Sequence, residues 1–415
     1  MRVFVTGIGA VSAFGNSWEE MRAKFLEGKN AVRYMSEWEG YKDLNTRLAA
    51  PIIDYKHPQE WDRKQLRSLG KVSCYSVHAA GLALKDAGLL NGEELQASNL
   101  DPSVQDGRMG VASGSSTGST DSILDMAKLV LDMDSGFNAN TYIKMMPHTT
   151  AANIALFYSL KGRIIPTSSA CTSGSHAIGY AYESIKNGSI DIAGGAEELC
   201  VSEAYVFDKL YATSVKNSTP NLSPTPFEKD RDGLVLGEGA GFLVLESEES
   251  ALKRGAKIYA EVVGFGSTCD GTHITRPQSA TMKAAMSLAL RDANLEPKSI
   301  GYVNAHATAT KHGDIAESIA TNELFGEDIA ISSLKSYLGH TLGACGGLEA
   351  IASIMMMREE LFFPTINLNV IDPECAKLNY LKEPAPIKTD FVMSNNFAFG
   401  GVNTSLIFKR VKNIF

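Results

Sequence analysis

An internal duplication constrains the fold of this chain more than any other feature of its sequence. The segment Val5–Gly9 (VTGIG) is echoed by Val263–Gly266 (VGFG), and Leu82–Leu89 (LALKDAGL) is echoed by Leu288–Leu295 (LALRDANL). A repeat of this kind indicates architecture more directly than local propensity does. We therefore expect two similar halves that pack against each other.

Each half also contains matching candidate strands. Residues 108–112 and 300–304 follow the repeated helical segments, and residues 242–245 and 404–408 follow Gly-rich turns near the end of each half. Strands that alternate with helices predict an α/β fold with helix-covered sheets. We place the halves at residues 1–252 and 253–415, and we expect reactive groups where the halves meet, because binding sites collect at the ends of strands in such sheets.

Composition narrows the function. The chain has 415 residues and a net charge of −8, which disfavours nucleic acid as a partner because phosphate binding needs a basic face. No apolar run approaches the ~18 residues of a membrane span, and Met1–Phe14 is better explained as a first strand and turn than as a signal peptide. The six cysteines show neither CxxC pairs nor metal-ligand spacing, so we expect reduced thiols, a cytoplasmic protein and no metal site.

One of the six cysteines, Cys171, lies in a segment typical of a nucleophile. It sits in PTSSACTSGSHAIG, between a strand that ends near Pro166 and a helix of small residues that we expect to stop at 186–188. A helix N-terminus favours a thiolate, so we expect the pKa of Cys171 to be lowered. An isolated cysteine is usually an inert core residue, but the surrounding Ser, Thr and Gly favour a reactive thiol here.

Two histidines follow predicted strand ends in the second half. His306 lies in NAHATATKHGD, and His340 lies in KSYLGHTLGA. A thiol hydrolase would need one base with an orienting Asn or Asp. Two N–H donors in a dry site suit a different task, which is to stabilise the enolate that forms when a malonyl thioester loses CO₂.

Together these motifs resemble the elongating ketosynthases of the thiolase-fold family. The matching segments are the Cys171 motif SSAC, the His306 motif NAHxTxT, the segment from Lys335 to His340, and the closing NFAFGGVN that contains Phe399. The resemblance covers the whole chain and is closest to the stand-alone ketosynthases of bacterial aryl polyene clusters. It implies a thiolase-like fold with a duplicated five-layer αβαβα architecture, usually as a homodimer.

The resemblance also implies an activity and site roles. The family's enzymes are β-ketoacyl-[acyl carrier protein] synthases, acyltransferases that condense an enzyme-bound acyl group with malonyl-ACP in fatty acid or polyketide biosynthesis. It implies that Cys171 carries the acyl group, that His306 and His340 support decarboxylation, and that Lys335 and Glu317 form a buried charged pair. The backbone N–H groups of Cys171 and Phe399 are the implied oxyanion hole, and no cofactor is implied.

Further residues are assigned to substrate by the same resemblance. It places Thr308 and Thr310 beside the phosphopantetheine arm, Phe399 at the gate and Phe397 among the residues that bind the substrate. It also places Ser115 at the floor of the acyl pocket, where its small size leaves room. Further implied sites are Asp314 in the supporting shell and a docking site for acidic acyl carrier protein at Arg63, Lys64 and Arg67. The sequence departs from the family pattern at Ala307, Ala309, Lys311 and Ala398, and the alanines restrict backbone freedom near the gate.

Two alternatives from other classes stay open at this point. A thiolase needs a second cysteine near the closing Gly-rich turn, where this chain has Phe397-Ala398-Phe399. A chain-length factor, a non-catalytic partner of a ketosynthase, typically lacks the nucleophile that is present here as Cys171. A dinucleotide-binding enzyme is disfavoured because Ser12 occupies the third glycine position of GxGxxG. Acyl chain length and the choice between homodimer and heterodimer are not determined by the sequence.

Overall fold

A large mixed sheet forms the centre of the computed structural model, which describes residues 1–185 and 190–412. The strands are β1 (Val3–Ser12), β2 (Arg33–Tyr34), β3 (Leu48–Ala50), β4 (Met109–Gly114), β5 (Ile164–Pro166), β6 (Ile190–Glu197), β7 (Leu236–Gly237), β8 (Gly239–Ser247), β9 (Ala260–Cys269), β10 (Tyr302–Asn304), β11 (Ala330–Ser332), β12 (Leu361–Phe362), β13 (Asn379–Tyr380), β14 (Ala385–Pro386), β15 (Phe391–Ala398) and β16 (Val402–Lys409). Eleven of them pair in the order β13-β11-β10-β15-β16-β9-β1-β8-β6-β4-β5.

The strand order shows the duplication directly. In the first half, β1 pairs antiparallel with β8, β8 antiparallel with β6, and β4 parallel with both β6 and β5. In the second half, β9, β16, β15, β10 and β11 repeat this pattern of directions in the same order. The two half-sheets join through β1 and β9, from Val3 opposite Val262 to Val5 opposite Ala260. The predicted duplicated architecture is confirmed.

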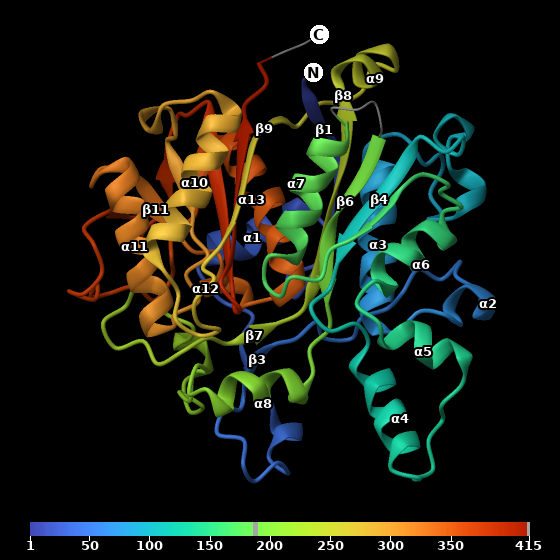
Figure 1. Cartoon of the computed structure of the whole chain (residues 1–415), viewed down its shortest axis with the longest axis horizontal. Coiled ribbons are helices and arrows are strands. Elements are labelled where there is room, and N and C mark those ends of the chain that lie inside the picture. Colours follow the sequence, from blue (N-terminus) through green and yellow to red (C-terminus); the bar gives the residue numbers. More distant parts are fainter. Residues whose placement is uncertain (186–189, 413–415) are drawn as a thin grey trace.

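Helices cover and separate the two half-sheets. They are α1 (Trp18–Glu27), α2 (Arg63–Leu66), α3 (Lys71–Asp86), α4 (Thr120–Val130), α5 (Ala139–Met145), α6 (Thr149–Phe157), α7 (Ser173–Ile185), α8 (Val201–Lys209), α9 (Glu248–Lys253), α10 (Ser279–Ala293), α11 (Lys311–Phe325), α12 (Lys335–Leu338) and α13 (Cys345–Glu359). Figure 1 shows α3 and α6 on the right, α7 and α13 in the middle, and α10 and α11 on the left. Because α3 packs on β1 and β8, α7 and α13 on both half-sheets, and α10 on β9 and β16, the fold has the predicted five αβαβα layers.

The repeated glycines explain why the duplicated segments are alike. A Cβ atom at Gly7 or Gly9 of β1 would lie 2.3 or 2.1 Å from a backbone oxygen of α3, and one at Gly264 or Gly266 of β9 would lie 2.3 or 2.1 Å from a backbone oxygen of α10. Only glycine allows the helix to pack this closely on the strand. The repeated aspartate completes each contact: Ile8 N donates to Asp86 Oδ2, and Phe265 N donates to Asp292 Oδ2.

The two central helices are in equally close contact. A Cβ atom at Gly346 of α13 would lie 2.3 Å from the backbone nitrogen of Ser175 in α7. The predicted helix after Cys171 is therefore present as α7, packed against α13 between the half-sheets, while its predicted stop at 186–188 lies outside the described residues. This packing brings the start of α7 next to elements of the second half.

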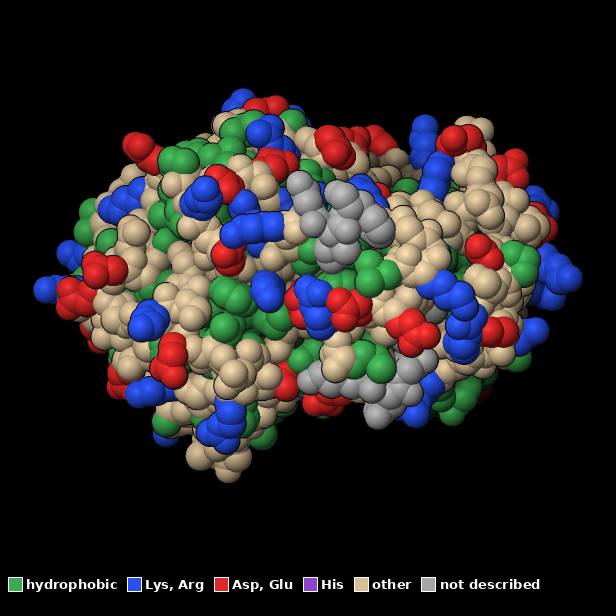
Figure 2. Space-filling model, turned by 90° about the horizontal axis from the view of Figure 1, so that it is seen from above, with side chains coloured by type: hydrophobic (Ala, Val, Ile, Leu, Met, Phe, Trp, Pro, Cys, Tyr) green, Lys and Arg blue, Asp and Glu red, His purple; other side chains and the backbone are tan. Residues whose placement is uncertain are grey.

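The surface gives few further indications of function. The view onto the end of the molecule that carries both termini shows Lys and Arg interspersed with Asp and Glu (Figure 2). Among the described residues, none of the helices has the length and apolar character required to cross a membrane. All six cysteines are free thiols.

Candidate active site

A cavity of about 440 Å³ lies where the two halves meet, and it contains the predicted nucleophile and both predicted histidines. Cys171 reaches it from the first half, and His306 and His340 reach it from the second half. The other predicted site residues that line the cavity are Glu317, Thr308, Thr310, Phe397 and Phe399. We expected reactive groups where the two halves meet, and Cys171, His306 and His340 line this cavity at that position.

Cys171 owes its position to a sharp turn between β5 and α7. Ala170 has φ of +53°, a left-handed conformation that is uncommon for a residue with a side chain, and α7 begins two residues after Cys171. The turn directs the thiol toward the second half, where Cys171 Sγ lies 2.9 Å from His340 Nε2. The nucleophile and a histidine are therefore in hydrogen-bond contact.

The pKa of this thiol differs from the sequence expectation. Burial removes the water that would stabilise a thiolate and raises the pKa of Cys171 to about 11. The backbone N–H groups of Phe399 and Cys171 and the charge of Lys335 act in the opposite direction, and burial outweighs them. The predicted lowering was wrong because burial of the thiol outweighs the groups that favour a thiolate. At neutral pH Cys171 is a thiol.

Both histidines are fixed through their backbone. His306 N donates to Glu317 Oε1 at 2.9 Å, and Ala307 N donates to Glu317 Oε2 at 2.7 Å. His340 N donates to Val235 O at 2.7 Å, so a segment of the first half holds this residue of the second. Burial, assisted by the charge of Lys335, lowers the pKa of both imidazoles well below the usual value, so both are neutral N–H donors at pH 7.

Lys335 has a different partner from the one predicted. Its Nζ forms a buried ion pair with Glu349 of α13, whose other oxygen accepts from Asn396 Nδ2 at 2.8 Å. Glu317 instead binds the backbone of the His306 loop, and burial raises its pKa to about 8. The predicted Lys335–Glu317 pair was wrong because Glu317 is held by two backbone donors, while Glu349 faces the ammonium group from α13.

Of the remaining residues predicted to bind substrate, Thr308 and Thr310 line the cavity and Ser115 does not. Thr308 and Thr310 lie on a turn in which Ala309 has φ of +70°, so one of the unusual alanines occupies a left-handed position that glycine adopts more readily. Ser115 is not among the residues that line the cavity, and its Oγ donates to buried Glu197 at 2.6 Å. Its assignment to the acyl pocket stays a prediction.

The predicted carrier docking site lies elsewhere on the fold. Arg63 and Lys64 begin α2, Arg67 directly follows it, and all three side chains are exposed. Figure 1 shows α2 on the far right, on the opposite side from α11, whose first residues line the cavity. The docking role therefore stays a prediction within this single chain.

Sequence reasoning missed several residues of the site. The sequence does carry a signal for Glu349, because it is the single charged residue in the segment LEAIASIMMM. His273 and His312 line the cavity, although their sequence surroundings gave no reason to select them. Arg231 also lines the cavity.

The donor set of the site could also hold a metal ion. The candidate ligand atoms of Cys171, His306 and His340 all lie within 4.8 Å of one another, and a thiolate with two imidazoles is a set that Zn²⁺ accepts. The same geometry serves acyl transfer without a metal, because it combines a nucleophile with two neutral donors.

Comparison with known proteins agrees with this arrangement. Residues 1–251 match the family described as "Beta-ketoacyl synthase, N-terminal domain", and residues 259–369 match "Beta-ketoacyl synthase, C-terminal domain". The 3-oxoacyl-[acyl-carrier-protein] synthase 2 of Synechocystis sp. is 37% identical, with 99% of this chain and 98% of that protein covered.

Solved structures show the same fold. A β-ketoacyl synthase from Burkholderia phymatum STM815 has 54% identity and a TM-score of 0.96, covering 99% of this chain and 100% of that one. A structure of the ketosynthase ApeO in complex with its chain length factor ApeC, from Xenorhabdus doucetiae, contains a chain with 26% identity and a TM-score of 0.82, covering 99% of this chain and 98% of that one. The chain therefore belongs to the β-ketoacyl synthase family.

Proposed function

We propose that the protein catalyses a decarboxylative Claisen condensation between an acyl group on Cys171 and a malonyl group on acyl carrier protein. The observation that carries this proposal is the contact of 2.9 Å between Cys171 Sγ and His340 Nε2, with neutral His306 beside them in one cavity. A nucleophile splits the condensation into two easier steps. Two neutral imidazoles in a water-poor site suit the enolate that forms on decarboxylation.

The first step transfers the acyl group. Cys171 Sγ attacks the carbonyl carbon of the acyl thioester, its bond to the carrier sulfur breaks, and the carrier thiolate takes the proton that Cys171 loses. Because the resting thiol has a pKa of about 11, its deprotonation accompanies the attack and takes place beside His340. The N–H groups of Cys171 and Phe399 both favour negative charge at the sulfur, which supports their assignment as the oxyanion hole for the tetrahedral intermediate.

The second step forms the carbon–carbon bond. Malonyl thioester loses CO₂, and His306 and His340 donate hydrogen bonds to the enolate oxygen. The enolate carbon attacks the acyl carbonyl on Cys171, and the carbon–sulfur bond breaks. The β-ketoacyl thioester leaves on the carrier, and the Cys171 thiolate takes a proton from water to return to the resting thiol. The Lys335–Glu349 pair keeps a positive charge near both imidazoles, which helps to keep them neutral. In this proposal the reaction needs no cofactor.

The residues that we assign to substrate binding all line the cavity. Thr308 and Thr310 contact the phosphopantetheine arm, and Phe399 and Phe397 close the path to Cys171. The resemblance of the sequence to the ketosynthases of aryl polyene clusters supports a role in aryl polyene biosynthesis, with fatty acid biosynthesis as the alternative pathway. A cytoplasmic location, where thiols stay reduced, fits the six free cysteines.

A second copy of this chain is the expected structural partner. The strand β5 ends the sheet and leaves one edge unpaired, with Ile164 45% exposed, and an open edge of this kind favours pairing with another chain. The helix α4 and the residues that follow it expose further apolar side chains, namely Leu124, Val130, Leu131 and Met133. Sedimentation of the purified protein should give the mass of a dimer. A protein that stays monomeric alone and dimerises only with a related ketosynthase would favour a heterodimer instead.

Incubation with acyl-ACP and malonyl-ACP tests the activity. Intact-mass measurement should show an acyl adduct after acyl-ACP alone, and β-ketoacyl-ACP with CO₂ after malonyl-ACP is added. The variant Cys171→Ala should lose both the adduct and the product. Condensation of two acyl-CoA molecules without CO₂ would indicate a thiolase, and a wild-type protein that forms no adduct would indicate a non-catalytic chain-length factor.

A further inference from the structure

One segment of the first half, Phe227–Gly237, lies against loops of the second half. Its backbone reaches His340, since His340 N donates to Val235 O at 2.7 Å and Gly237 N donates to His340 O at 2.9 Å. At its other end, Phe227 O accepts from Asp372 N at 2.9 Å. The segment therefore links the two halves directly at the edge of the cavity.

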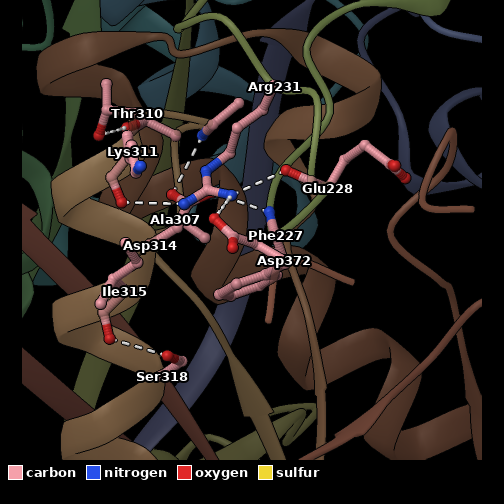
Figure 3. Close-up of polar contacts among 12 residues, drawn as sticks. Phe227, Glu228, Arg231, Ala307, Thr310, Lys311, Asp314, Ile315, Ser318 and Asp372 are labelled. Carbon is pink, nitrogen blue, oxygen red and sulfur yellow. Dashed lines mark hydrogen bonds and ion pairs between the residues drawn. The ribbon is translucent and has the colours of Figure 1, made fainter. Parts of the chain in front are cut away.

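Arg231 is the charged anchor of this segment. Its Nη1 donates to Asp372 Oδ2 and to Glu228 O, both at 2.7 Å, and its Nη2 donates to Lys311 O at 2.9 Å. Its Nε forms an ion pair with Asp314 Oδ2 at 3.2 Å. The side chains of Arg231 and Asp314 are 1% and 0% exposed, so solvent screens this contact little. Figure 3 shows the guanidinium surrounded by these partners.

Asp314 also binds the turn that carries Thr308 and Thr310. Its Oδ1 accepts from Ala309 N at 3.2 Å, and its Oδ2 accepts from Phe227 N at 2.8 Å. Ala309 occupies a left-handed conformation that costs about 1–2 kcal/mol for a residue with a Cβ atom, so the turn depends on outside contacts. Thr308 and Thr310 flank Ala309 and line the cavity.

We propose that Arg231 is a positioning residue: it holds the Asp314 carboxylate in place and thereby fixes the turn that presents Thr308 and Thr310 to the substrate arm. This inference rests on the proposed function, because the threonines are assigned to phosphopantetheine there. The planar fork of an arginine is required, since a lysine ammonium could not reach Asp314, Asp372 and the backbone carbonyl oxygens together. Arg231 acts through Asp314, not on the reacting atoms.

Arg231 also keeps the Asp314 carboxyl group ionised, which favours its hydrogen bond with Ala309 N. Burial raises the pKa of Asp314 to about 6, and the guanidinium of Arg231 opposes that rise. Without Arg231 more of the Asp314 population would be protonated at neutral pH. A protonated carboxyl group has one oxygen fewer to accept a hydrogen bond, so the contact with Ala309 N would weaken.

Amide hydrogen exchange tests the placement without any substrate. In the intact protein, Arg231→Gln should make the Ala309 amide exchange at least about tenfold faster, while the His306 and Ala307 amides stay protected by Glu317. If Arg231→Gln does not fold, Asp372→Asn is the deciding variant and should change Ala309 in the same direction. The matched control Arg254→Gln removes an ion pair with Glu246 on another part of the fold and should leave Ala309 unchanged.

Kinetics of acyl loading from acyl-ACP then test the consequence. Arg231→Gln should raise KM between about 10-fold and 100-fold, while alkylation of Cys171 by iodoacetamide, which does not use the threonine turn, changes less than about twofold. In KM for acyl loading, the double variant with Asp314→Asn should be no worse than Asp314→Asn alone, because Arg231 acts on the threonine turn through Asp314.

Two results would overturn the inference. One is an unchanged exchange rate at Ala309 in every variant that folds, and the other is additive losses from Arg231→Gln and Asp314→Asn. A wild-type protein that loads no acyl group would count against the proposed function instead, and the exchange measurement would still decide whether Arg231 holds the turn.

Discussion

The protonation state of Cys171 leads to a quantitative prediction. Burial raises the pKa of Cys171 to about 11 and lowers that of His340, so the Sγ–Nε2 contact joins a neutral thiol to a neutral imidazole. With that pKa the thiolate fraction is about 10⁻⁴ at pH 7 and about 10⁻² at pH 9. Because iodoacetamide reacts with the thiolate, the alkylation rate of Cys171 should rise about tenfold per pH unit between pH 7 and pH 9.

The assay follows the mass of the peptide that contains Cys171 after timed alkylation at each pH. Free cysteine, with a pKa of about 8.5, provides the reference and should approach its plateau near pH 9. The variant Cys171→Ser confirms that the adduct belongs to this residue. A rate that is constant between pH 6 and pH 8 would show a preformed thiolate–imidazolium pair and would refute the reasoning from burial.

Three further changes test the packing of the site. Glu349→Gln should lower the free energy of unfolding by about 3–5 kcal/mol in urea titration, because it leaves the buried ammonium of Lys335 unpaired; a loss below about 1 kcal/mol would contradict this. Gly346→Ala places a Cβ atom 2.3 Å from a backbone nitrogen of α7 and should cost about 1–3 kcal/mol, whereas Gly40→Ala, with open space around it, should cost far less. Ala309→Gly should raise the midpoint of thermal unfolding, since glycine accepts φ of +70° and the gain is about 0.5–1 kcal/mol; a lower midpoint would count against a strained turn.

Much of the fold could be predicted because the duplication is visible in short repeated motifs. Each motif recurs because it makes the same local contact in both halves. The glycines Gly7 and Gly264 and the aspartates Asp86 and Asp292 recur since each half packs one helix on one strand through the same contacts. Alternation of strands and helices then places the strand ends together. The residues that follow those ends, His306 among them, could be selected for the same reason.

The electrostatics could not be predicted in the same way. Two backbone N–H groups and the charge of Lys335 favour a Cys171 thiolate, but burial outweighs them, and burial depends on both halves at once. The partner of Lys335 depends on the rotation of α13 between the half-sheets, which brings Glu349 inward. A helix that is buried on every face has no polar side from which its orientation could be inferred. The pairing of Lys335 with Glu317 rested on the family resemblance, and the resemblance did not identify Glu349.

A second cysteine shows how much of the chemistry comes from the surroundings. Cys345 begins α13 as Cys171 precedes α7, and its Sγ donates to Cys171 O at 3.2 Å. Burial raises its pKa well above the usual value, and it is not among the residues that line the cavity. Both thiols lie at the start of a central helix, so a helix terminus by itself does not make a nucleophile. Cys171 differs because the cavity reaches it and because His340 lies within hydrogen-bond distance of its sulfur, and these two properties depend on the meeting of the two halves.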